Sequence, residues 1–540
     1  MKDISSTGSF INFYLNNYIY VDKTQYIRDL IKLERVFISR PRRFGKSLTL
    51  DTIATLFETG VEPYFKGTWI YDKWTEPTYP VLRLNFLDLD KYSLEHFKQK
   101  LNAIISSFAR DINVKNYEEK VEPEDTIYFL LDELRKEKRQ IVILIDEYDC
   151  QMTANINNET LYKQFQEKIK SFYATIKNKW PIKFLGITGV TRLKDVEIFS
   201  IGSDINDITN DSVYSQMIGF TRDEIKKYYI DYLKLAASYE NKCRVEEVTD
   251  TQIESMLDMM AQNYDGYCFD EFYKKKVFST WSVNKFFQSA VSNKFVYFGE
   301  YWYDNGGLPS ILVNYLKTHE LNIFEYLDKD KFLKVSSDDF KNPTALTTIN
   351  QNVLMCQTGY LTLRSDLNKT STVALGIPNG EIYKALNRLL ANNIFKGNTD
   401  ITDDYGRSLL EVGTVDDIIN LFNSALNSVS YDNYPIVSES SVQNMLKLYL
   451  LGAHQKVLSE VHEAKGRADL VVNTDNRRIV FEFKYAKNET EAKSKLHDAV
   501  EQIKTRDYGN IVPNKTELLR IAAVFNADPK VRAFTEYQEV

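Results

Sequence analysis

The 540-residue sequence has few of the residues that hold zinc or form disulfides. Its four cysteines, Cys150, Cys243, Cys268 and Cys356, are widely spaced and form no CxxC pair. Its five histidines show no HExxH spacing. A zinc site or a disulfide framework is therefore not expected.

The sequence also lacks a long hydrophobic run. No run approaches the roughly 18 apolar residues that a membrane-spanning helix requires, and the N-terminal segment has no apolar centre of the kind found in signal peptides. From these absences we expect a protein that makes no membrane contact and works in the reducing environment of the cytoplasm.

The charge balance excludes a surface that is basic throughout. The net charge is −7, which still leaves room for the local basic groove that nucleic-acid binding needs. A chain of this length is expected to form roughly two to four domains. Its 35 tyrosines and 31 phenylalanines are enough for several packed cores.

Strands and helices alternate over residues 15–220. Short apolar runs predict strands, and longer stretches with helical spacing separate them. The predicted strands are 35–40, 80–86, 140–149 and 181–190, and long helices are predicted over 91–110 and 160–178. This succession predicts an α/β unit in which a parallel sheet has helices on both faces.

The remainder of the chain has a different pattern. Residues 221–430 are mostly helical, with a polar linker at 334–348 and a strand-like unit at 358–379 that is typical of a winged-helix-like hairpin. Residues 431–540 predict a small α/β unit with a helix at 440–453, strands at 468–473 and 478–484, a polar helix at 488–507 and a last strand at 520–525. We therefore predict three domains, spanning 1–220, 221–430 and 431–540.

The segment FISRPRRFGKSLTLDTI, residues 37–53, is typical of a phosphate-binding loop that leads into a helix, although Arg40 stands where the first glycine is usual. In such a loop the backbone amides and the helix N-terminus cradle phosphates. Lys46 is expected to reach the outer phosphates, and the Ser47 hydroxyl to ligate Mg²⁺. The residues assigned to the nucleotide here are Arg43, Phe44, Gly45, Lys46, Ser47 and Leu48.

A second nucleotide-site element lies about 100 residues later, in the order expected for a P-loop ATPase. IVILIDEYD is an apolar strand that ends in two carboxylates, Asp146 and Glu147, and such a position disfavours charge unless a cation is nearby. Asp146 fits a ligand of Mg²⁺ or of its water, and Glu147 fits the base that polarises an attacking water. Solvated acids in a turn at the strand end are the alternative.

The strand in FLGITGVTRL ends in further polar residues. Thr188, Thr191 and Arg192 are placed to sense the γ-phosphate if this strand lies between the two preceding ones. Arg42 and Arg43 contact phosphate, a partner or only solvent, and the sequence leaves these alternatives open.

Together with several further segments, these motifs resemble those of the AAA-ATPase-like proteins of bacteria and their mobile elements. The resemblance covers nearly the whole chain and runs through YVDKTQYIRDLI, RPRRFGKS, LIDEYD, ITGVTRLKDVEIFSIGSDINDIT, NYDGYCF, STWSVNKF, YWYDNGG, QTGYLTL and LGIPNGEIY. It implies an AAA-like P-loop ATPase domain and a C-terminal nuclease-like domain. In the family that the sequence resembles, the loop usually has an arginine at the position of Arg40. Asp22 and Lys23 belong to the same pattern and are expected near the nucleotide or beneath the loop.

The C-terminal unit contains GRADLVVNTDNRRIVFEFKYAK, residues 466–487. Glu482 and Lys484 are two apart on one predicted strand and therefore point to the same side of the sheet. A hairpin through NTDN can bring Asp469 beside them. Asp469 and Glu482 suit one or two Mg²⁺ or Mn²⁺ ions, and Lys484 suits orientation or deprotonation of the attacking water.

This arrangement resembles the PD-(D/E)xK nuclease signature, with Ala468 in place of the proline. By that resemblance a helix glutamate joins the site, for which Glu439 is the candidate and Glu463 a second acidic option. Gln502 and Tyr508 match a Gln-to-Tyr pattern on the later helix and are expected to contact substrate. Solvated or helix-capping roles remain open for these four residues, and an inert remnant of the fold remains open for Asp469, Glu482 and Lys484.

Basic residues surround the same unit and can form a surface that follows a phosphate backbone. Acidic residues are interleaved with them, so ordinary pairing along an exposed helix is an alternative for 488–506. The basic residues are Lys465, Arg467, Arg477, Arg478, Lys487, Lys493, Lys495, Lys504 and Arg506.

These observations favour an ATP-binding and ATP-hydrolysing protein coupled to a metal-dependent nuclease that acts on nucleic acid, DNA more than RNA. A homo-oligomer is compatible with this hypothesis, because such ATPases often need an arginine from a neighbouring subunit. The alternatives are a nucleotide-switched signalling or scaffold protein that does not cut, and a binding module in which both sites have decayed.

Overall fold

The computed structural model describes residues 1–177, 179–193, 205–304, 310–316, 323–343, 345–395, 405–453, 455–463, 466–508 and 517–540. The chain divides into two compact units. Unit 1 comprises Met1–His319 and Phe332–Ile382, and unit 2 comprises Glu320–Lys331 and Tyr383–Val540. The division into three domains stays a prediction.

A five-stranded sheet forms the centre of the first part of unit 1. Its strands run parallel in the order β2–β3–β4–β1–β5. They are β1 (Arg35–Ser39), β2 (Val81–Asn85), β3 (Ile141–Asp146), β4 (Ile182–Gly189) and β5 (Asn206–Asp207). The prediction that the strand at 181–190 lies between the other two site-bearing strands is confirmed, because β4 pairs with both β1 and β3.

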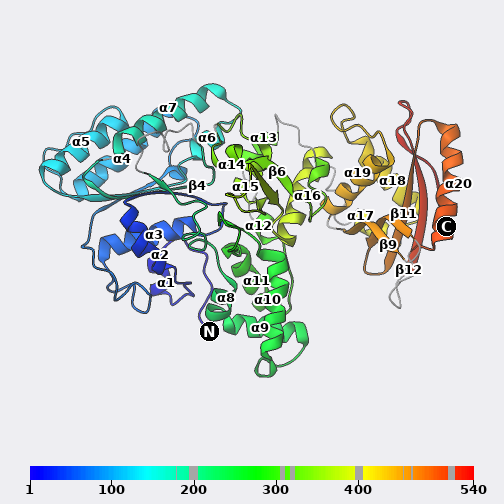
Figure 1. Cartoon of the computed structure of the whole chain (residues 1–540), viewed down its shortest axis with the longest axis horizontal. Helices are drawn as coiled ribbons and strands as arrows, with labels where there is room; N and C mark the ends of the chain where they lie inside the picture. Colours follow the sequence, from blue (N-terminus) through cyan, green and yellow to red (C-terminus); the bar gives the residue numbers. More distant parts are fainter. Residues whose placement is uncertain are drawn as a thin grey trace. The chain divides into compact units, whose positions relative to one another are not determined.

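Helices cover both faces of this sheet, as predicted (Figure 1). One group lies on the side of the N-terminus and consists of α1 (Phe10–Leu15), α2 (Thr24–Leu30) and α3 (Lys46–Thr59). The other group consists of α4 (Leu94–Asp111), α5 (Pro123–Lys136), α6 (Cys150–Ala154) and α7 (Glu159–Ile176). The Ser93 and Asn158 side chains cap α4 and α7 by accepting backbone N–H bonds, which accounts for where these helices begin.

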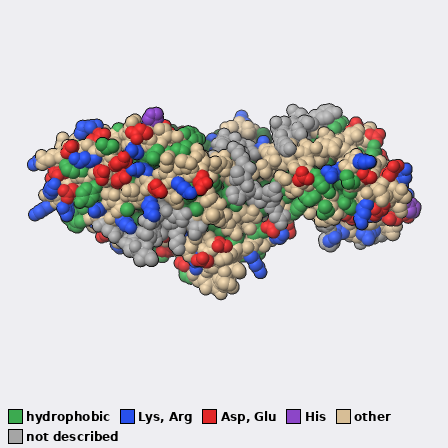
Figure 2. Space-filling model, turned by 90° about the horizontal axis from the view of Figure 1, so that it is seen from above, with side chains coloured by type: hydrophobic (Ala, Val, Ile, Leu, Met, Phe, Trp, Pro, Cys, Tyr) green, Lys and Arg blue, Asp and Glu red, His purple; other side chains and the backbone are tan. Residues whose placement is uncertain are grey.

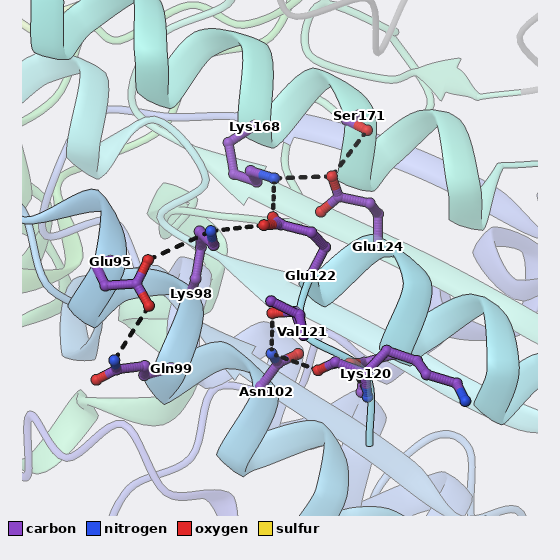
Figure 3. Close-up of polar contacts among 11 residues, drawn as sticks. Glu95, Lys98, Gln99, Asn102, Lys120, Val121, Glu122, Glu124, Lys168 and Ser171 are labelled. Carbon is purple, nitrogen blue, oxygen red and sulfur yellow. Dashed lines mark hydrogen bonds and ion pairs between the residues drawn. The ribbon is translucent and has the colours of Figure 1, made fainter. Parts of the chain in front are cut away.

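An ion-pair network ties α4, α5 and α7 to one another (Figure 3). The Glu122 carboxylate, at the start of α5, pairs with Lys98 of α4 at 2.7 Å and with Lys168 of α7. Lys168 also pairs with Glu124 at 2.8 Å. Asn102 of α4 donates hydrogen bonds to the backbone carbonyls of Lys120 and Val121. The lysines are largely buried, so the network is stronger than an exposed pair would be.

The rest of unit 1 is mostly helical. It contains α8 (Arg222–Tyr228), α9 (Ile230–Asn241), α10 (Asp250–Tyr264), α11 (Thr280–Asn293), α12 (Tyr301–Asp304), α13 (Ser310–Leu316), α14 (Ser337–Lys341) and α15 (Gln351–Thr358). Aromatic residues of α8–α11, such as Tyr229, Phe286 and Phe287, pack in one core.

A small antiparallel sheet in the order β6–β8–β7 completes unit 1. Its strands are β6 (Leu333–Ser336), β7 (Thr362–Leu363) and β8 (Thr372–Gly376). The strand-like unit at 358–379 is thereby confirmed. The expectation of a polar linker at 334–348 is wrong in part, because β6 and α14 occupy its beginning: Leu333 and Val335 are buried, and the Ser336 side chain caps α14.

Unit 2 is built on a second five-stranded sheet, in the order β13–β12–β11–β10–β9, in which only β11 and β12 run parallel. Its strands are β9 (Lys456–Glu463), β10 (Gly466–Asn473), β11 (Arg477–Ala486), β12 (Glu517–Asn526) and β13 (Ala533–Glu539). Its helices are α16 (Gly380–Ile394), which begins in unit 1, α17 (Tyr405–Val412), α18 (Val415–Asn427), α19 (Glu439–Gly452) and α20 (Glu489–Arg506).

The sequence prediction for unit 2 placed the helices and central strands correctly but missed both edge strands. The strand at 520–525 is not the last one, because β13 follows it, and β9 precedes β10. Edge strands are polar on their open side, and the sequence of β13, AFTEYQE, therefore carries a weak apolar signal. Within the parts of the chain that the structure describes, no helix combines the length and apolar character needed to cross a membrane.

The ion-pair network predicts that Glu122→Gln destabilises unit 1. Hydrogen bonds from Lys168 and Lys98 hold the pKa of Glu122 below its ordinary value, so the carboxylate stabilises the fold at neutral pH and ceases to do so in acid. We expect a loss of roughly 1 kcal/mol in unfolding free energy at neutral pH, measured by urea denaturation, and a smaller loss at acidic pH.

Glu118→Gln is the matched control, because Glu118 is 69% exposed and pairs only with Lys120 in the described chain. Equal effects of the two substitutions at neutral pH would contradict a stabilising role of the network.

Candidate active sites

The phosphate-loop segment joins a buried strand to a helix in unit 1. All five residues of β1 are buried, and α3 begins at Lys46. Gly45, the residue before the helix, has φ +102°, and Arg43 has φ +69°. The left-handed conformation that the turn requires therefore falls at Arg43 and Gly45, not at the position of the absent glycine.

Arg40 explains why this loop needs no glycine at its start. Its side chain is fully buried behind the loop, and Nη1 donates hydrogen bonds to the carbonyls of Ser39 and Thr209. The guanidinium lies 4.2 Å from the ring centroid of Phe269, and burial lowers its pKa to about 9. Arg40 thus anchors the loop to the core.

The Lys46 ammonium is folded back over the loop. It is 5% exposed, and Nζ donates to the carbonyls of Arg40 at 3.0 Å and Pro41 at 3.1 Å. Burial lowers its pKa, and the carboxylates of Asp146 and Glu147 act in the opposite direction. The two carbonyl bonds hold the ammonium where a phosphate oxygen can replace them.

Asp146 gathers the polar groups of three elements. Its carboxylate accepts hydrogen bonds from the Ser47 hydroxyl at 2.6 Å, from the Thr188 hydroxyl and from the backbone N–H of Glu147 at 3.0 Å. Through Ser47, Asp146 and Thr188, the elements α3, β3 and β4 therefore meet at one edge of the sheet. Burial raises the pKa of Glu147, which Lys46 opposes, so this carboxyl is a better proton acceptor than a solvated glutamate.

The structure adds Asp149, a residue that sequence reasoning passed over. It is 2% exposed, and its carboxylate accepts hydrogen bonds from the backbone and hydroxyl of Thr191. The adjacent Gly189 has no room for a side chain, since a Cβ there would lie 2.5 Å from the Tyr148 ring. Thr191 therefore serves to join β4 to the DEYD turn.

Three residues assigned to the nucleotide point elsewhere. The Phe44 ring is buried against Tyr267 and Phe269. Arg43 donates to the carbonyls of Tyr301 and Trp302 and lies 4.7 Å over the Trp281 ring. Arg192 pairs with Asp207 of β5. Their nucleotide-contact roles stay predictions.

A cavity of about 350 Å³, here called the nucleotide cavity, opens beside the loop. Residues 43–48 line one wall. Sequence reasoning missed the other walls, which come from residues 5–8 and from Trp281 and Asn284 of α11. Asn284 accepts a hydrogen bond from Tyr229 and donates one to the carbonyl of Ser5, so α11 fixes the N-terminal segment across the cavity.

In the sequence, the only indication of this wall is the family segment STWSVNKF, and its residue spacing does not show that it packs against the phosphate loop. Lys23 also lines the cavity and pairs with Glu224 at 2.6 Å, while Asp22 accepts a backbone hydrogen bond from Trp69. Lys23 thus shares a cavity with the loop, whereas the contacts of Asp22 are with Thr24 and Trp69, and the expected role of both residues stays a prediction.

In unit 2 the hairpin of β10 and β11 brings the three predicted catalytic residues together. The strands pair antiparallel with Leu470 opposite Phe481, so Asp469 and Glu482 are the next residues along the two strands. Asp469 accepts a hydrogen bond from the backbone N–H of Phe483 at 2.8 Å.

Glu482 is completely buried, and its two oxygens differ. Oε1 accepts a hydrogen bond from Lys484 Nζ at 2.7 Å, whereas Oε2 is buried with no hydrogen-bond partner in the described chain. Burial, and secondly the charge of Asp469, raise the pKa of Glu482 to about 7. A buried acceptor without a donor is costly, and a cation would satisfy it.

Lys484 connects the strand residues to α19. Its Nζ also lies 3.4 Å from Glu439 Oε1 and 3.1 Å from the carbonyl of Phe483. Burial alone would lower the pKa of Lys484, but Glu482 outweighs it and the pKa is raised, so the ammonium stays charged. Glu439, predicted as the helix glutamate, is therefore beside the other three residues.

The remaining C-terminal candidates do not contact Asp469, Glu482 or Lys484 through their described hydrogen bonds. Gln502 donates to the Tyr508 hydroxyl at 3.2 Å, and that hydroxyl donates to the carbonyl of Arg467 at 2.8 Å. The pair thus braces α20 against the start of β10. The side chain of Glu463 and all of Lys465 lie outside the described residues.

The basic residues of this unit are partly neutralised. Lys493 pairs with Glu489 and Lys495 with Glu491, each four residues apart on α20. Arg477 pairs with Glu517. The alternative of ordinary pairing along an exposed helix therefore holds for Lys493 and Lys495. On the face seen in Figure 2, acidic and basic side chains are interspersed.

The donor groups of both sites suit a hard divalent cation such as Mg²⁺. In unit 2 these are the carboxylates of Asp469 and Glu482, one of which has an unpartnered oxygen. In unit 1 they are the hydroxyl of Ser47 and the carboxylate of Asp146. Across the described residues no cluster of three or more His, Cys, Asp or Glu side chains is arranged to hold a metal, so the remaining positions would fall to water, backbone or substrate oxygens.

Comparison with known protein families assigns both ends of the chain. Residues 5–199 match a family described as predicted AAA-ATPase, AAA-ATPase-like. Residues 437–535 match the PD-(D/E)XK nuclease superfamily. The chain joins an AAA-ATPase-like domain to a PD-(D/E)XK nuclease-superfamily domain.

One similar protein spans both domains. An uncharacterized protein in the vnfD 5′ region of Azotobacter chroococcum mcd 1 is 25% identical over 532 residues, which are 95% of this chain and 94% of that protein. Among solved structures, Cdc6p from Pyrobaculum aerophilum aligns over 68% of this chain and 93% of its own, with 12% identity and a TM-score of 0.28. The Orc1 protein of Aeropyrum pernix in complex with DNA aligns over 71% and 97%, with 11% identity and a TM-score of 0.27.

The raised pKa of Glu482 makes the stability of the nuclease-superfamily domain depend on pH. Between about pH 4.5 and pH 7 the folded carboxyl keeps a proton that the unfolded one loses, so unfolding free energy falls as pH rises, by up to about 1.4 kcal/mol per pH unit. Glu482→Gln removes the titrating group, and we expect it to flatten this dependence in urea denaturation followed across that range.

Glu489→Gln is the control, because Glu489 is 72% exposed and pairs with Lys493 on the same domain. A Glu482→Gln variant that keeps the wild-type pH slope would show that the buried carboxyl does not titrate in this range.

Proposed function

We propose that the AAA-ATPase-like domain binds and hydrolyses ATP, and that this controls a metal-dependent nuclease site formed by Asp469, Glu482, Lys484 and Glu439. The observation that carries the proposal is the convergence of two carboxylates and a lysine on β10 and β11, with one buried carboxylate oxygen lacking a donor. We propose the division 1–220, 221–430 and 431–540 for the ATPase, middle and nuclease domains.

In the ATPase domain the residues take complementary parts. Lys46 is expected to exchange its two carbonyl partners for phosphate oxygens when ATP enters the nucleotide cavity. Ser47 and Asp146 would hold Mg²⁺. Glu147, whose pKa is raised by burial, orients and deprotonates water, and Thr188 fixes the Asp146 carboxylate between the two strands.

In the nuclease domain Asp469 and Glu482 would hold Mg²⁺ or Mn²⁺. The bound ion supplies Lewis-acid activation of a phosphodiester and its attacking water. Since the pKa of Lys484 is raised, its ammonium orients the attacking water and stabilises negative charge that develops on the phosphate, whereas proton removal falls to another group. Glu439 holds Lys484 from the helix side, and Gln502 with Tyr508 supports the strand that carries Asp469.

The substrate that we propose is nucleic acid, DNA before RNA, because the chemistry cleaves phosphodiesters and Lys487, Lys504 and Arg506 lie in the same domain. A cytoplasmic protein of a defence, toxin or mobile-element system is a setting consistent with this function. Assembly into a homo-oligomer would supply the arginine that many such ATPases take from a neighbouring subunit.

The proposal predicts that the purified full chain cuts labelled DNA in the presence of ATP and Mg²⁺ or Mn²⁺, and that Lys484→Ala lowers the rate by about 100-fold or more. Lys46→Ala is expected to abolish ATP binding in calorimetry and the response of cutting to ATP. The assay compares single-stranded DNA, duplex DNA and RNA, each with and without ATP.

Lys493→Ala is the matched control, since Lys493 is 62% exposed on α20 and pairs only with Glu489 in the described chain. Cutting that survives Lys484→Ala would exclude the proposed nuclease site. ATP binding without cutting of any of these substrates would instead support a nucleotide-switched binding protein.

A further inference from the structure

A second cavity of about 340 Å³ lies next to the nucleotide cavity, with six tyrosines among the residues that line it. Its tyrosines come from α1, from the segment that follows α1, from the turn after α3, and from α8 and α9, which gather near the N-terminus in Figure 1. They are Tyr14, Tyr18, Tyr20, Tyr64, Tyr228 and Tyr232. We call this space the tyrosine cavity.

Most of the tyrosine hydroxyls make no hydrogen bond within the described chain, although some of the rings are packed. The Lys227 ammonium lies 4.8 Å over the Tyr228 ring, and Tyr20 meets Phe10 and Phe13 edge to face. Tyr232 donates to the carbonyl of Lys2, and the Tyr20 hydroxyl lies 3.5 Å from that of Thr52. For the other four, Tyr14, Tyr18, Tyr64 and Tyr228, the structure shows no hydroxyl hydrogen bond to any described residue. Tyr14 and Tyr64 meet edge to face at 5.6 Å, an arrangement that leaves ring surface open.

Three lysines also line the tyrosine cavity: Lys2, Lys66 and Lys227. All three are exposed, and none forms an ion pair with another described residue. The acidic residues of the lining are Asp22 and Asp231. The Asp22 carboxylate accepts hydrogen bonds from Thr24 and from the backbone N–H of Trp69 and keeps its charge, so the three lysines exceed the two aspartates by one positive charge.

We propose that the tyrosine cavity binds a nucleobase that carries a phosphate group. Aromatic side chains stack on bases of any sequence, and adjacent lysines attract the phosphates. The volume suits a small ligand of this size. Because the chain is proposed to act on nucleic acid, an unpaired base of a strand is the natural source, and a free nucleotide has the same chemistry.

The position of the cavity gives such binding a consequence for the ATPase domain. Phe13, Ile19 and Tyr20 line both cavities, and Tyr20 reaches Thr52 of α3, the helix that begins at the phosphate loop. A base held by the tyrosines therefore contacts the wall of the nucleotide cavity.

The test measures binding of fluorescein-labelled oligo-dT by anisotropy to the full chain, with EDTA to prevent cutting. We expect Tyr64→Ala to weaken binding by about tenfold or more, Tyr64→Phe to retain it, and Lys66→Glu to weaken it with a reduced salt dependence. The controls are Tyr92→Ala, a tyrosine 70% exposed outside the cavity, and Lys100→Glu on α4. Thermal unfolding confirms that each variant is folded.

A second readout separates this site from the nuclease domain, which is also proposed to bind nucleic acid. An oligonucleotide with 5-iodouracil is photocrosslinked, and the crosslinked peptides are identified by mass spectrometry. We expect crosslinks at Tyr64 or Tyr228 that persist in Lys484→Ala, so failure of the nuclease proposal would leave this result unaffected. Thymidine monophosphate is then added as a competitor of the labelled oligonucleotide, with the Lys46→Ala variant so that the phosphate loop does not bind it. Displacement of the oligonucleotide indicates that the cavity takes a free nucleotide, and no displacement indicates that it takes a base of a strand.

Either source supports the proposed ligand chemistry. Unchanged affinity in folded Tyr64→Ala and Lys66→Glu, together with no crosslink at any tyrosine of the cavity, would overturn it.

Discussion

A carboxylate that stands at the end of a buried apolar strand or within one has to be compensated, and both candidate sites are organised around this constraint. Asp146 ends a strand whose other residues are buried, and Ser47 and Thr188 from neighbouring elements donate to it. Glu482 is buried more deeply, and Lys484 satisfies only one of its oxygens. The first carboxylate is thus compensated by the protein, whereas the second retains an acceptor that suits a cation.

The same constraint explains the unusual phosphate loop. The first glycine position of the loop carries a charged side chain, that of Arg40, which points into the core. There it donates hydrogen bonds to backbone carbonyls and packs on the face of Phe269. The loop is thereby held from behind, so Lys46 and Ser47 can face the opposite side. Sequence reasoning found the loop from Gly45, Lys46 and Ser47, but the direction of the Arg40 side chain depends on Thr209 and Phe269, which are distant in sequence.

Sequence patterns sufficed for the elements with strong apolar periodicity. The strands β1–β4 and the helices α4, α7, α19 and α20 were predicted close to their bounds. The pairing of Asp469 with Glu482 follows from the spacing of a hairpin. Features that depend on tertiary contacts were not predictable. The N-terminal segment crosses the nucleotide cavity because Asn284, nearly 280 residues later, donates to the carbonyl of Ser5, and β13 is polar because it lies at the edge of the sheet.

We propose above all that Asp469 and the buried Glu482 of the C-terminal domain together hold a divalent cation. Crystals soaked in Mn²⁺ and measured at the manganese absorption edge test it most directly. We expect an anomalous difference peak between Asp469 and Glu482 that is lost in crystals of Glu482→Gln. A well-ordered domain at saturating Mn²⁺ with no peak between these carboxylates would contradict it.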